Sequence, residues 1–67
     1  MNHVRTVRVL NRVSQYELER RCGIRAATIS LIEREYREAR ESQKMRLAQA
    51  LGVSVAELFP EDGNGAA

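Results

Sequence analysis

Apolar residues recur every three or four positions along most of the chain, and polar residues fill the positions between them. This spacing is typical of amphipathic helices. It predicts five short helices, at about residues 3–10, 14–22, 26–35, 42–51 and 54–59. No stretch alternates apolar and polar residues as a strand would, so the sequence predicts an all-α fold. The length of 67 residues suits one domain, which we place at residues 1–60, followed by a flexible tail at residues 61–67.

Glycine and serine residues separate the predicted helices. Ser14 with Glu17, and Ser54 with Glu57, have the spacing of a capping box at the start of a helix. Gly23 interrupts a stretch that could otherwise form one continuous helix. Because glycine adopts a positive φ at little steric cost, we expect a sharp turn there. Two short helices then meet at a steep angle instead of forming one long helix.

The charge is distributed unevenly along the chain. The net charge is only +2, but residues 1–40 contain nine Arg and five Glu, whereas residues 41–67 contain two basic and four acidic residues. Guanidinium groups suit phosphate because they offer a planar fork of donors. The arginine-rich part is therefore a candidate surface for nucleic acid. On composition alone, an ordinary solvated helical surface explains the pattern slightly better.

Several function classes are disfavoured by what the chain lacks. Cys22 is the single cysteine, so neither an intramolecular disulfide nor a cysteine-based zinc cluster is expected, and burial as a small apolar residue is favoured for it. No apolar run approaches the length of a membrane span and no signal peptide is evident, which favours a cytoplasmic protein. No catalytic set of side chains stands out, so we expect neither an enzyme nor a cofactor or metal.

Several short motifs stand in a fixed order along residues 4–59, and they are Ser14-Gln15, Leu18, Gly23-Ile24, Thr28-Ile29-Ser30, Ile32-Glu33-Arg34 and the stretch at 47–59. This ordered set resembles the Cro and phage-repressor helix-turn-helix domains, also called the xenobiotic-response-element family. The resemblance implies a compact five-helix, lambda-repressor-like fold. It also implies that the second and third helices bind DNA, with the third, at about residues 26–35, in the major groove.

The resemblance also implies which residues meet DNA. The positions that match the contact surface of the family are Gln15, Arg25, Ala26, Ala27, Ser30, Leu31 and Arg34. We add Thr28 for its hydroxyl and Arg37 for its charge. Tyr16 could contact a phosphate through its hydroxyl, although half-buried packing is an equally good interpretation. Arg8 and Glu33 match a pair that resembles a structural salt bridge between the first and third helices.

Five positions depart from the pattern of the family. Ala26 and Leu31 stand where long polar side chains often contact bases, so contacts with thymine methyl groups and DNA shape are expected to contribute. Arg25 replaces the usual Ser or Thr cap of the third helix. Glu19 replaces a small residue, and we expect its carboxylate to point into water. Glu35 replaces a glycine, so we expect the third helix to run on past it.

The sequence therefore predicts a sequence-specific, repressor-like transcriptional regulator that binds double-stranded DNA without a cofactor. We expect a homodimer on a pseudo-palindromic site, with dimer contacts in the connection before the fourth helix or near Val55, Leu58 and Phe59. One alternative is an antitoxin or anti-repressor, which would bind a protein partner through the face around Leu31 and bind DNA weakly. Another is an architectural protein that contacts only the DNA backbone.

Overall fold

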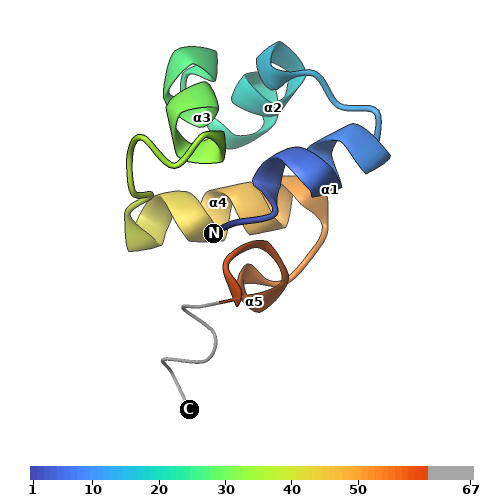
Figure 1. Ribbon diagram of the computed structural model, residues 1–67. Helices are drawn as coiled ribbons and strands as arrows, with labels where there is room; N and C mark the ends of the chain where they lie inside the picture. The colour runs from blue at the N-terminus through green and yellow to red at the C-terminus, as the bar shows by residue number, and fades with distance from the viewer. Residues whose placement is uncertain (61–67) are drawn as a thin grey trace.

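The computed structural model describes residues 1–60, which form five helices joined by short connections (Figure 1). The helices are α1 (Val4–Leu10), α2 (Gln15–Cys22), α3 (Ala26–Glu33), α4 (Glu41–Leu51) and α5 (Val55–Leu58). No strand occurs within residues 1–60, so the predicted all-α fold is confirmed. The predicted tail at residues 61–67 lies outside the described residues. Within residues 1–60, no helix is long and apolar enough to cross a membrane.

One hydrophobic core joins the five helices. In Figure 1, α4 runs across the middle of the molecule, with α2 and α3 on one side and α5 on the other. The largest side chains with no appreciable exposure come from every helix, and they are Val4, Leu18, Ile29, Ile32, Leu47 and Leu58. Full burial of such a side chain stabilises the fold by about 1.5–3 kcal/mol. In this core α2 packs against both α3 and α4, and the outer sides of α2 and α3 remain exposed.

The connection between α2 and α3 has the predicted sharp turn. Gly23 has a φ of +79°, in the left-handed region, and its N–H donates to the Glu19 carbonyl at 2.8 Å. At the other end of α2, the Ser14 hydroxyl accepts a hydrogen bond from the Glu17 N–H at 3.0 Å. The Glu17 carboxylate pairs with Arg21 at 3.2 Å, and it makes no reciprocal bond to the Ser14 N–H, so the predicted capping box is only half formed. These ends limit α2 to eight residues.

The expectation that α3 runs past Glu35 is wrong, because the helix ends at Glu33. Glu35 itself has a φ of +66°, the conformation for which the family usually has glycine. The Tyr36 N–H donates to the Leu31 carbonyl at 2.9 Å and the Glu35 N–H to the Ile32 carbonyl at 3.1 Å. This pair of bonds is a Schellman motif, which caps the last carbonyls of a helix. Glu35 therefore takes the left-handed position of this helix end, where glycine is usual.

The proposed dimer contacts near the last helix are also wrong in part. Leu58 is fully buried and Phe59 is 7% exposed, since both belong to the core of the chain itself. The Leu58 carbonyl accepts a hydrogen bond from the His3 N–H at 2.8 Å, which ties α5 to the start of α1. Neither apolar side chain is available to a second copy of the chain. Val55 is only half-buried.

Candidate nucleic-acid interface

An open hollow lies between the start of α2 and the outer side of α3. It is lined by Gln15, Tyr16, Glu19, Arg25, Ala26, Ala27, Ser30, Leu31 and Arg34. Eight of these nine residues are among those proposed from the sequence to contact DNA, and the ninth is Glu19. Residues that are far apart in the sequence are thus gathered on one surface by the turn at Gly23.

The helical periodicity of α3 decides which of its side chains this surface exposes. Ala26, Ile29 and Ile32 are buried against the rest of the domain. Ala27 is exposed, whereas Ser30 and Leu31 are half-buried. Ala26 is only 8% exposed, so this predicted contact residue offers little surface to a ligand. The outer side of α3 consequently presents one exposed and two half-buried side chains, none of which is charged.

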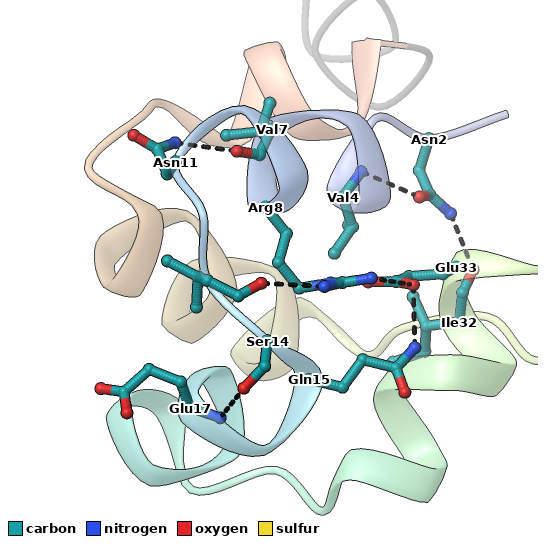
Figure 2. A network of polar contacts seen from close by, with 11 residues as sticks. Asn2, Val4, Val7, Arg8, Asn11, Ser14, Gln15, Glu17, Ile32 and Glu33 are labelled. Atoms are coloured by element: carbon teal, nitrogen blue, oxygen red, sulfur yellow. Dashed lines mark hydrogen bonds and ion pairs between the residues drawn. The ribbon is translucent and has the colours of Figure 1, made fainter.

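A network of polar contacts fixes Gln15 at one edge of the hollow (Figure 2). The Arg8 Nε donates to a Glu33 carboxylate oxygen at 2.7 Å, and the Gln15 Nε2 donates to the other oxygen at 3.0 Å. The side chains of Arg8 and Glu33 are only 12% and 3% exposed. Arg8 also donates to the Val13 carbonyl at 2.8 Å. The structure thus contains the expected ion pair and shows that it holds the Gln15 amide in one orientation.

Arginine side chains occupy other parts of the rim. Arg25 precedes α3 and is exposed, and its side chain makes no capping hydrogen bond. The Arg34 guanidinium lies over the ring of Tyr36, 5.3 Å from the ring centroid. Such a contact holds a cation at a defined place while leaving most of its donors accessible. Two positive charges therefore border the hollow, an arrangement that suits the phosphates and the base edges of a duplex.

The first turn of α3 is capped by Glu19, and the expectation that its carboxylate points into water is wrong. The Ala26 N–H donates to Glu19 Oε1 at 2.9 Å, and the Glu19 side chain is half-buried. A carboxylate at this end of a helix satisfies an otherwise unpaired donor and interacts favourably with the helix dipole. Glu19 thus supplies the cap that Arg25 does not. These two departures from the family pattern are explained together.

Comparison with known proteins agrees with this geometry. Residues 4–58 match the profile of a family described as helix-turn-helix. The chain belongs to this family. The match spans α1 to α5, and it confirms both the resemblance to the Cro and phage-repressor type and the lambda-repressor-like fold. Among curated proteins and solved structures, no significant match to the chain was found.

The family consists of DNA-binding regulatory domains and not of enzymes, so the chain is a DNA-binding helix-turn-helix regulator. Its helix-turn-helix unit is α2, the turn at Gly23 and α3. The hollow lies on the outer side of this unit. We therefore treat the hollow as the candidate DNA interface.

Two residues proposed from the sequence lie outside the hollow of the helix-turn-helix unit. Thr28 is half-buried on α3 and does not line it. Arg37 lies in the connection between α3 and α4, where it lines a second hollow together with Lys44 and Phe59. The structure therefore does not bring these two side chains together with Gln15 and Arg25.

Asn2 makes a contact that sequence reasoning did not predict. Its side-chain Nδ2 donates to the Ile32 carbonyl at 2.9 Å, and its Oδ1 accepts from the Val4 N–H at 3.1 Å (Figure 2). Its backbone N–H donates to Glu35 Oε2 at 2.7 Å. Asn2 thus joins the start of α1 to the end of α3. A single polar residue near a chain terminus gives no periodic pattern from which this role could be predicted.

The structure also shows the place of the lone cysteine. Cys22 is 8% exposed, and its sulfur accepts a hydrogen bond from the Ile24 N–H at 3.4 Å. The expectation of burial for Cys22 is confirmed. Within residues 1–60, no group of three or more His, Cys, Asp or Glu side chains is placed to hold a metal ion.

Proposed function

We propose that this helix-turn-helix protein is a sequence-specific, repressor-like transcriptional regulator of the cytoplasm that inserts α3 into the major groove. The observation that carries the proposal is the common hollow formed by eight of the residues expected to contact DNA. In this arrangement the start of α2 lies across the DNA backbone, and the outer side of α3 faces the base edges.

The chemistry of the hollow supports distinct tasks for its residues. Gln15 is held by Glu33, and its amide oxygen has no partner within residues 1–60, so it offers an oriented acceptor to the duplex. Arg25 and Arg34 supply charge for phosphates. Ala27 and Leu31 supply apolar surface for thymine methyl groups, and Ser30 adds a hydroxyl for either a base or a phosphate.

We further propose that the protein binds DNA as a homodimer. Two-fold symmetric binding would place two copies of α3 about one helical turn, or roughly 34 Å, apart. With Leu58 and Phe59 buried and Val55 half-buried, the better candidate for the dimer contact is the connection at residues 34–40. Tyr36 in this connection is 74% exposed, which is consistent with such a contact.

Selection from a pool of random duplexes at near-physiological salt tests the proposal. We expect the retained sequences to share a two-fold symmetric consensus. Retention without a consensus would favour an architectural protein with backbone contacts only. No retention by folded protein would contradict the proposal and favour the alternative, in which the face around Leu31 binds a protein.

Replacement of Arg34 by Ala tests the role of the rim. If Arg34 neutralises one phosphate, affinity falls to a similar extent for all sequences, and the slope of log affinity against log salt becomes shallower by about 1. Arg5→Ala is the matched control, because Arg5 is an exposed residue of α1 that does not line the hollow. An equal effect of both variants would show that only net charge matters.

A further inference from the structure

An acidic side chain lies on the surface that we assign to an anionic ligand. Glu19 lines the hollow together with Gln15, Tyr16 and Arg25. Within residues 1–60 it forms no ion pair, although the residue is half-buried. A carboxylate near phosphates is repelled by them, so Glu19 weakens the general attraction to DNA while it caps α3.

Only one of the two carboxylate oxygens of Glu19 accepts a hydrogen bond within residues 1–60. Oε1 accepts from the Ala26 N–H at 2.9 Å, whereas Oε2 has no hydrogen-bond partner within residues 1–60. The bond to Ala26 restricts the carboxylate to one place in the hollow. Ala26 and Ala27, whose side chains are small, line the same open hollow. Glu19 thus presents an oriented, charged acceptor where α3 itself offers few polar groups.

We propose that Glu19 is a specificity-determining residue that accepts a hydrogen bond from the exocyclic amino group of a base, with cytosine preferred. This inference rests on the proposed insertion of α3 into the major groove. There, cytosine presents an N4 amino donor, whereas guanine presents two acceptors and thymine an acceptor and a methyl group. Adenine presents an amino donor beside the N7 acceptor. A carboxylate is therefore attracted most by cytosine and repelled most by guanine.

The negative charge of Glu19 also weakens binding to DNA sequences that lack the preferred base. Where no amino group faces Oε2, the carboxylate loses water without gaining a donor, and binding becomes weaker. Specificity is a difference between affinities, and a repulsive element increases it as effectively as an attractive one. Glu19 thus compensates for the small side chains of Ala26 and Ala27, which distinguish bases poorly.

The test compares the consensus selected by the wild-type protein with that selected by Glu19→Gln. The amide keeps an oxygen for the Ala26 N–H but loses the charge and gains donors. We expect the preference for cytosine at one position of each half-site to disappear, with adenine favoured instead, because glutamine pairs well with adenine. Affinity for non-specific DNA should rise several-fold as repulsion is removed.

Glu17→Gln is the matched control. Glu17 is on the same helix, but it pairs with Arg21 and does not line the hollow. This variant removes the same charge and should leave the consensus unchanged. An identical consensus for the wild-type protein and Glu19→Gln would overturn the inference and leave the proposed function intact. A wild-type protein that selects no consensus would instead overturn the proposed function itself, and this inference with it.

A second measurement needs no variant and so does not depend on the folding of one. In the selected duplex, the cytosine assigned to Glu19 is replaced by 2-pyrimidinone, which lacks the amino group. We expect the affinity of the wild-type protein to fall about tenfold, the usual scale of one base contact. The same replacement at a cytosine outside the half-sites is the control. Unchanged affinity at the assigned position would overturn the inference.

Discussion

A carboxylate lies at each end of α3, Glu33 from α3 itself and Glu19 from α2, and the two have very different surroundings. At the end of the helix, Glu33 is 3% exposed and accepts hydrogen bonds from Arg8 and Gln15. At the start, Glu19 is half-buried and accepts one hydrogen bond, from the Ala26 N–H. The end of α3 is therefore fixed by long-range side-chain contacts, whereas its start depends on a single cap.

This difference separates a structural acid from one that remains available to a ligand. A buried charge whose partners are complete adds order but has no capacity left for another molecule. A carboxylate with only one oxygen hydrogen-bonded, such as that of Glu19, is oriented by the fold and can still accept a hydrogen bond from a ligand. The same residue type thus serves stability at one end of α3 and, in our proposal, base recognition at the other.

The largest effect is expected from Glu33→Ala. This change leaves the guanidinium of Arg8 buried without its partner, and loss of one member of a buried ion pair costs about 3–5 kcal/mol. Urea unfolding followed by circular dichroism should show a correspondingly lower free energy of unfolding. Combining Arg8→Met with Glu33→Leu should recover much of the loss, because no charge is then left unpaired. A loss below about 1 kcal/mol for Glu33→Ala would show that the pair is unimportant.

The next largest effect is expected from Gly23→Ala, which acts at the end of α2, in the turn that leads to α3. Gly23 has a φ of +79°, and a residue with a Cβ there costs about 1–2 kcal/mol. An added Cβ would meet only the Arg46 side chain, at 3.9 Å, so the cost is conformational and not steric. Thermal unfolding measures it. Gly23→Asn should lose less stability than Gly23→Ala, since Asn tolerates this conformation better, and the reverse order would contradict this explanation.

The main features of the fold could be predicted from the sequence because they follow from local patterns. The five helices follow from the spacing of apolar residues, and the turn at Gly23 follows from the conformational freedom of glycine. The ion pair of Arg8 with Glu33 required the family resemblance, because it joins residues 25 positions apart. Once the turn at Gly23 sets α3 beside α2, the residues expected to contact DNA lie in one hollow.

The features that could not be predicted are those in which one departure compensates for another. Glu35 takes the conformation of the missing glycine because the Schellman bonds form and Asn2 holds its carboxylate. Glu19 caps α3 because Arg25 cannot. Helix propensity treats each position alone, so it predicts that α3 continues past Glu35 and that the Glu19 carboxylate lies in water. Only the three-dimensional contact shows that these substitutions belong together.

A smaller effect is expected from Glu19→Ala, which removes the cap of α3. Loss of a helix cap costs about 1 kcal/mol, which lowers the melting temperature of a domain of this size by about 4–8 °C. Adding Arg25→Ser restores a conventional cap in front of α3 and should recover most of this loss. If the double variant is no more stable than Glu19→Ala, then Glu19 stabilises the domain by some means other than capping.

The smallest effect is expected from Glu17→Gln, which breaks an exposed ion pair on α2. The side chains of Glu17 and Arg21 are 42% and 46% exposed, and such pairs contribute about 0.3–0.5 kcal/mol. The free energy of unfolding should change by no more than this, and the change should vanish in about 1 M salt, where charges are screened within roughly 3 Å. The loss in Glu33→Ala should largely persist in the same salt, because the side chains of Arg8 and Glu33 are only 12% and 3% exposed and are screened much less. If salt abolished both effects equally, the ion pair of Glu33 would be no more protected from solvent than the exposed pair of Glu17, which would contradict the structural role of Glu33.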